Sequence, residues 1–214
     1  MSSTWGPGSL LEQCPDLLAR LAAELPADRY QLAALTHPNT WHWHGRRQVT
    51  AWYAASARRG LLLVPPEDGW RAVLAASDVL VGDHGSVTSY GAAAGIPVTL
   101  AVFPDGEVDP QSQVAYLGKI APRMCLDRPI ACQLDQSVAA WTPELHAAFR
   151  AGVTSVPGQA ARTIRTVMYQ LMNLAEPAAP PYVDPVPVPA ASQWQRAGAG
   201  RLLAARIGHA PCSC

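Results

Sequence analysis

The fold is decided by the stretch Asp78-Val79-Leu80-Val81-Gly82-Asp83-His84-Gly85-Ser86-Val87-Thr88. A short apolar run leads into a turn that contains two glycines, and a helical pattern follows the turn until Gly95 ends it. A buried strand that runs directly into a helix is the unit from which parallel sheets are built. Because the N-terminus of a helix exposes unpaired N–H groups and the positive end of the helix dipole, this turn is suited to phosphate.

The alternation of strand and helix signals continues on both sides of this stretch. We expect strands at 30–36, 61–64, 79–81 and 96–102, and helices at 10–25, 45–59, 70–76 and 86–94. Short strands that are apolar on both faces are typical of a parallel sheet covered by helices. The sequence therefore predicts an α/β fold with a doubly wound, Rossmann-like parallel sheet, in which ligands bind at the carboxyl ends of the strands.

The pattern weakens after Pro104. Further helices are expected at 113–119, 144–150 and 157–174. The last of these is amphipathic, with apolar residues on one side at Ala161, Ile164, Val167, Met168, Leu171 and Leu174. Residues 176–190 are rich in Pro and Ala, which indicates an extended linker, and only a weak helical pattern follows at 193–207. We expect one α/β domain over residues 1–175 and a mostly disordered Pro-rich tail over residues 176–214.

Composition excludes several classes of protein. Lys and Arg together number 16, as do Asp and Glu, so no basic field is available to attract nucleic acid. The first residues do not resemble a secretory signal, and no apolar run reaches the roughly 20 residues of a membrane-spanning helix. The five cysteines form no disulfide framework, and we interpret Cys212-Ser213-Cys214 as a frayed terminus rather than a metal site. We expect a cytoplasmic protein.

The loop at 82–88 contains the residues best suited to bind a phosphate group. Gly82 and Gly85 allow a tight turn and the close approach of a ligand. Ser86 and Thr88 add hydroxyl donors, and His84 adds a donor that can carry charge.

The same residues also have a purely structural interpretation. Asp83 or Ser86 is suited to cap the helix, and Gly85 is suited to the turn. The dinucleotide pattern G-x-G-x-x-G, the phosphate loop G-x-x-x-x-G-K-[ST] and the hydrolase pattern G-x-S-x-G are all absent.

Two further loops follow predicted strands. The first, at 37–45, contains three histidines, but no Cys or carboxylate in the loop completes a metal site, so we predict no metal. His37 comes directly after a strand and is expected at the ligand edge. In the second loop, Glu67 and Asp68 are suited either to accept a hydrogen bond from a ribose hydroxyl or to cap a helix. Trp70 is suited to stack on a base, although we interpret it as a core residue.

Residues 70–87, closed by 94–98, resemble the C-terminal domain of GT-B proteins, in particular the CDP-glycerol glycerophosphotransferases and the UDP-GlcNAc 2-epimerase group. The loop Asp of that pattern matches Asp83, its hydroxyl residue matches Ser86, and its His-Pro matches His37-Pro38. Residues 2–6 are similar to the first strand and loop of the same domain. The chain departs from the glycerophosphotransferases at His84-Gly85, where they have two small residues.

This resemblance implies that residues 1–175 bind a nucleotide-diphosphate donor, of the CDP-glycerol or NDP-sugar type, for a metal-independent and cofactor-free transfer. His37 and His84 are the expected catalytic residues, since either is suited to protonate or stabilise the leaving phosphate. The expected donor-binding residues are Thr4, Gly6, Glu67, Gly82, Asp83, Gly85, Ser86 and Thr88.

Members of this family carry an N-terminal acceptor domain before this one. We therefore expect a fragment or a split transferase whose acceptor half is supplied by a partner domain or chain. Any contact with a membrane is expected only through that partner. Two other functions stay open, namely a non-catalytic binding or regulatory half-protein and an epimerase-like enzyme acting on a UDP-sugar. The epimerase would need carboxylates near the donor, for which Glu67, Asp68 and Asp83 are the candidates.

Overall fold

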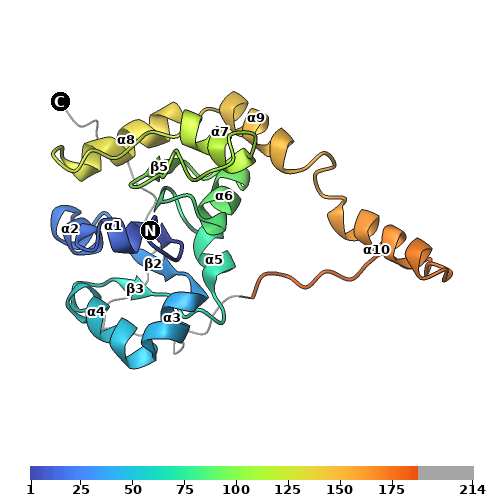
Figure 1. Cartoon of the computed structure of the whole chain (residues 1–214), viewed down its shortest axis with the longest axis horizontal. Helices are drawn as coiled ribbons and strands as arrows, with labels where there is room; N and C mark the ends of the chain where they lie inside the picture. Colours follow the sequence, from blue (N-terminus) through green and yellow to red (C-terminus); the bar gives the residue numbers. More distant parts are fainter. Residues whose placement is uncertain (188–214) are drawn as a thin grey trace.

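Short parallel strands form the centre of the computed structural model, which describes residues 1–187 (Figure 1). Within this range the strands are β1 (Ser2–Ser3), β2 (Ala33–Thr36), β3 (Leu62–Leu63), β4 (Leu80–Gly82) and β5 (Val98–Leu100). They form one sheet in the order β1-β2-β3 and a second sheet of β4 and β5, and each described pair is parallel. The predicted α/β class and the parallel pairing are confirmed, although the strands are shorter than predicted.

Helices surround the strands on all sides in Figure 1. They are α1 (Leu10–Gln13), α2 (Leu17–Glu24), α3 (Pro38–His44), α4 (Arg46–Arg58), α5 (Trp70–Ala75), α6 (Ser86–Ala93), α7 (Gln113–Ile120), α8 (Ile130–Ala140), α9 (Pro143–Val153) and α10 (Ala160–Leu171). Helices α2, α3 and α4 cover the β1-β2-β3 sheet, whereas α6 to α9 lie around β4 and β5. One large apolar cluster fills each of these two regions.

Three elements differ from the sequence-based expectation. The helix predicted at 10–25 is two helices, because Pro15 has no N–H to donate and its ring blocks a continuous helix. The segment after β2, predicted as an irregular loop, is the helix α3, in which Pro38 occupies the first turn, where a missing N–H costs nothing. Helix α8 was not predicted; its buried face consists of Ile130, Gln133, Leu134 and Ser137.

Helix α10 lies apart from the rest of the molecule (Figure 1). It has no buried residue, and the predicted apolar side is exposed to solvent along its length. Its polar side binds the segment that follows, because Arg165 and Thr166 both donate to the Glu176 carboxylate at 2.8 Å.

Residues 176–187 contain no helix or strand. The remainder of the predicted tail, with the expected helix at 193–207 and the terminal cysteines, lies outside the described residues. Among the residues that are described, no helix is both long and apolar enough to cross a membrane.

Two glycines allow α6 to pack directly on β4. A Cβ atom added to Gly82 would lie 2.3 Å from the Oγ1 atom of Thr88, and one added to Gly91 would lie 2.5 Å from a methyl group of Leu80. Both separations are far below van der Waals contact. The glycines therefore set the distance between the strand and the helix that follows it, and with it the position of the loop between them.

We expect Gly82→Ala to destabilise the fold by about 2 kcal/mol, because the added methyl group overpacks the contact with Thr88. The double variant Gly82→Ala/Thr88→Ala should recover most of this loss, since it removes the clashing atoms. Thr88→Ala alone serves as the control. Urea unfolding monitored by circular dichroism measures all three, and an unchanged midpoint for Gly82→Ala would contradict this account of the packing.

Candidate functional site

The carboxyl ends of four strands meet at one edge of the molecule. Beyond the end of β2, the N–H of His37 donates to the carbonyl of Ser3 in β1 at 3.1 Å, and beyond β5 the N–H of Ala101 donates to the carbonyl of Gly82 in β4 at 2.9 Å. The loops after β1 and β2 thus leave on one side, as do those after β4 and β5, and the hydrogen bond from the Thr4 N–H to Asp83 brings both pairs of loops to the same edge. This is the edge at which ligands bind in parallel α/β proteins.

The buried carboxylate of Asp83 connects the loop after β4 to the loop after β1. Its Oδ2 atom accepts hydrogen bonds from the N–H groups of Thr4 at 2.8 Å and Leu10 at 2.9 Å, and from the hydroxyl of Ser3 at 3.4 Å. Its Oδ1 atom accepts from the N–H of Gly85 at 2.9 Å. Asp83 is inaccessible to solvent, so both oxygens serve the protein itself. The structure thus gives Asp83 the role of positioning these loops.

The N-terminus of α6 faces this edge without a side-chain cap. Gly85 occupies the capping position, where the sequence offered Asp83 or Ser86 as candidates, and no side chain accepts from the first turn. Ser86 begins the helix and is exposed, so its hydroxyl is accessible to a ligand, and the first-turn N–H groups have no side-chain partner. Thr88 is fully buried against Gly82 and lies on the core side of α6.

His84 lies at this edge of the molecule, beside the loop that follows β1. Its ring stands edge-on to Phe103 at 6.5 Å between centroids, and a Cβ atom added to Gly8 would lie 3.5 Å from its Cε1 atom. The Nδ1 atom is buried and has no hydrogen-bond partner within the described residues. The same hypothetical Cβ on Gly8 would lie 3.3 Å from the carboxylate of Glu107, so Glu107 also belongs to this edge. The sequence pattern gave no signal for Glu107, because the loop that carries it has no recognisable motif.

His37 and Gly6 have defined structural roles at the edge. The Nδ1 atom of His37 accepts a hydrogen bond from the N–H of Asn39 at 3.1 Å and thereby caps α3. Gly6 has a φ of 96°, a conformation that favours glycine, and its carbonyl accepts from the N–H of Ser9 at 2.9 Å in a tight turn.

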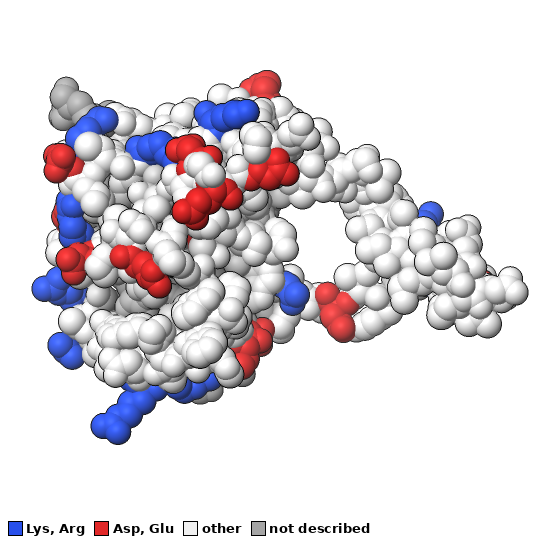
Figure 2. Space-filling model, in the orientation of Figure 1, with Lys and Arg blue, Asp and Glu red and all other residues white. Residues whose placement is uncertain are grey.

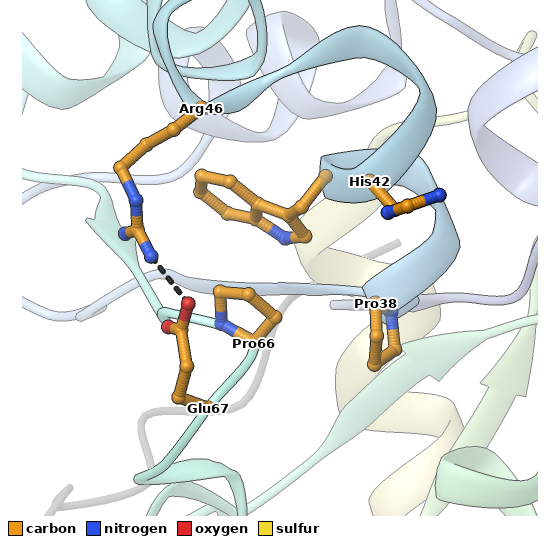
Figure 3. A pocket seen from close by; sticks show the side chains of 6 residues that line it. Pro38, His42, Arg46, Pro66 and Glu67 are labelled. Carbon is orange, nitrogen blue, oxygen red and sulfur yellow. Dashed lines mark hydrogen bonds and ion pairs between the residues drawn. The ribbon is translucent and has the colours of Figure 1, made fainter.

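Glu67 lies in a hollow whose lining includes no residue of the loop at 82–88. The hollow has a volume of about 400 Å³. It lies between the loop after β3 and helices α3 and α4 (Figure 3), and its lining residues are Pro38, Trp41, His42, Arg46, Pro66 and Glu67.

Glu67 and Arg46 contribute exposed polar groups to this hollow, and Trp41 contributes a buried one. Glu67 forms an exposed ion pair with Arg46, and the hydrogen bond from the guanidinium, more than any other contact, lowers the pKa of the carboxyl. The indole N–H of Trp41 has no partner within the described part of the chain, although the side chain is only 8% exposed. Trp41 and Arg46 were not identified from the sequence, because their contribution depends on the unpredicted helix α3.

Trp70 is partly buried against the apolar clusters on both sides of α5, and its ring stacks on that of Tyr90 at 6.0 Å.

No group of His, Cys, Asp and Glu residues within 1–187 has the geometry to hold a metal ion.

Protein-family models, curated proteins and solved structures were compared with the chain. None of them matches it. The resemblance of residues 70–98 to GT-B proteins therefore stays a prediction, and any proposal of function depends on the residues of the site.

We expect Asp83→Asn to destabilise the fold by about 3 kcal/mol, because the new amide cannot accept from every backbone N–H that now bonds to the carboxylate. The matched control is Asp78→Asn, which changes an exposed carboxylate a few residues away and should alter stability little. Urea unfolding measures both variants. Equal stabilities would show that Asp83 does not hold the two loops together.

Proposed function

We propose that this chain is the donor-binding half of a GT-B-like transferase, with the diphosphate of a nucleotide donor at the loop 82–88. In this proposal the two sheets are parts of one doubly wound sheet in the order β3-β2-β1-β4-β5. That order is supported by the position of β1 beside β4 and by the hydrogen bonds of Asp83 between their ends. The donor is of the CDP-glycerol or NDP-sugar type.

The observation that carries the proposal is the uncapped N-terminus of α6 at the edge where the loops after β1 and β4 meet. A diphosphate at this position accepts hydrogen bonds from the first-turn N–H groups and from the Ser86 hydroxyl, and it gains from the helix dipole. The N–H groups that donate to Asp83 offset part of the repulsion between its carboxylate and a diphosphate.

In this proposal the nucleoside of the same donor occupies the hollow lined by Trp41, Arg46 and Glu67. The exposed carboxylate of Glu67 is suited to accept hydrogen bonds from the ribose hydroxyls. Since Arg46 and Glu67 are both exposed, their ion pair can exchange for contacts with a ligand at little cost.

Transfer from such a donor produces negative charge on the departing nucleotide. The N–H groups of α6 and the side chain of His84 stabilise that charge, which is the electrostatic contribution expected of this half of the enzyme. His84 or His37 provides the proton for the leaving phosphate. The base that activates the acceptor hydroxyl comes from the partner half.

The alternative functions differ in how well the site suits them. An epimerase-like reaction is less well supported, because Asp83 is buried and already fully hydrogen-bonded. A non-catalytic donor-binding module uses the same loop and the same hollow. Turnover of the bound donor in the presence of an acceptor half separates this module from a transferase.

We expect saturable binding of one nucleotide series when the purified chain is titrated with CDP-glycerol, UDP-GlcNAc, CMP and UMP by calorimetry. Ser86→Ala and His84→Ala should each weaken binding roughly tenfold, because each removes a hydrogen bond to a charged phosphate. Ser155→Ala, at an exposed serine far along the chain, is the control. If the folded chain binds none of the four compounds, the donor site does not lie on this loop.

A further inference from the structure

Five aromatic rings form a continuous cluster on the surface beside the β1 loop, which we call the aromatic patch: Trp5, His42, Trp43, His44 and Trp52. The indoles of Trp5 and Trp43 stack with centroids 6.4 Å apart and planes 11° from parallel. The ring of His44 lies 6.1 Å from Trp5 and 4.8 Å from Trp52. The rings contact one another, and so the patch is preformed.

The tryptophans of the patch are unusually accessible. Trp43 is 69% exposed, Trp52 is 43% exposed and Trp5 is 37% exposed. Trp is enriched both in protein–protein interfaces and where a bilayer meets water, so the charge beside the patch decides between these two partners.

Four of the five rings of the patch lie within residues 37–60, and the Arg side chains of that segment are not balanced by any acidic residue within it. Residues 37–60 contain four arginines, at 46, 47, 58 and 59, and no Asp or Glu. Figure 2 shows an uncharged surface over α3, with Lys and Arg side chains along the lower edge of the molecule, where α3 and α4 lie, and with acidic side chains above and to the right. Arg46 is paired with Glu67, which leaves the other arginines of α4 and its end to act on a negatively charged surface.

We propose that the aromatic patch and the neighbouring arginines Arg47, Arg58 and Arg59 form a contact surface for an anionic lipid bilayer. The indoles enter the region of the headgroups, where their apolar rings and N–H groups are both accommodated. The arginines lie at the level of the lipid phosphates, to which a guanidinium donates in a forked geometry. This proposal does not depend on the donor site, and it places membrane contact on this chain itself rather than on a partner.

The rigid support of the patch favours this role. Trp43 and His44 lie in α3, which is fixed by the buried side chain of Trp41 and by the cap at His37. Trp52 lies on α4 near the buried Tyr53. Because these helices are ordered without any partner, the exposed rings lose little conformational freedom when they enter a bilayer.

We expect the chain to sediment with vesicles of phosphatidylcholine mixed with phosphatidylglycerol, and to do so much less with phosphatidylcholine alone. Added salt should weaken the interaction, because it screens the arginines. The double variant Trp43→Ala/Trp52→Ala should bind the anionic vesicles about tenfold more weakly, and Arg47→Glu/Arg58→Glu should lower binding by a similar factor. A shift of tryptophan fluorescence to shorter wavelength on vesicle addition gives an independent readout.

Two controls separate the patch from other exposed surfaces. Tyr90→Ala removes an exposed aromatic ring outside the patch and should leave binding unchanged. Met168→Ser/Leu171→Ser changes the exposed apolar side of α10 and should also leave it unchanged.

Three outcomes would overturn the proposal. One is no binding of the folded chain to anionic vesicles at low salt. Another is binding that survives the tryptophan variant but is lost in the α10 variant. The third is binding of a single-stranded oligonucleotide, but not of vesicles, that requires Trp43 and Trp52.

Discussion

The geometry of the functional edge depends on the hydrogen bonds that the carboxylate of Asp83 accepts. This carboxylate is the only charged side chain among residues 1–187 that is fully buried, and it is stabilised there by donors from three different segments of the chain. A buried carboxylate without these donors would be very unfavourable. The loops after β1 and β4 therefore cannot separate without exposing the N–H groups of Thr4 and Leu10 and leaving the charge of Asp83 unsatisfied.

The packing of α6 on β4 completes this arrangement. Asp83 fixes the loop after β4 through its hydrogen bonds to the segment after β1. Gly82 and Gly91 set the distance between β4 and α6. As a result the first turn of α6 has a defined position although no side chain caps it. A site that binds anions through backbone N–H groups requires this kind of rigidity, because such groups cannot adjust independently of the chain.

Much of the fold could be predicted from local sequence patterns. The helices α4 to α6 and the strands β3 to β5 occur where apolar runs and helical periodicity indicated them, because those signals extend over only a few residues. Pro15 and Pro38 show the limit of that approach. A proline inside an apolar helical pattern splits the helix at 10–25, whereas a proline after β2 begins one. The periodicity around each proline does not distinguish these two effects.

The roles of individual site residues were less predictable, because they depend on partners far away in the sequence. Asp83 matched a loop pattern associated with donor binding, but its hydrogen bonds to Thr4 and Leu10 could not be derived from residues 78–88. Glu67 follows β3, as expected. Its partner Arg46 begins α4, directly after α3, and α3 was expected to be a loop, so the pair could not be foreseen. The exposure of Trp43 and the burial of Trp41, two residues earlier, also follow only from the helix.

The long separation between Asp83 and its donors has a consequence for how the chain folds during synthesis. Thr4 and Leu10 precede Asp83 by 79 and 73 residues. The loop after β1 cannot acquire its native hydrogen bonds until β4 has left the ribosome, so the early strands remain incomplete while the segments between them are made. Contacts of this range slow folding, and they leave strand edges available to other chains in the meantime.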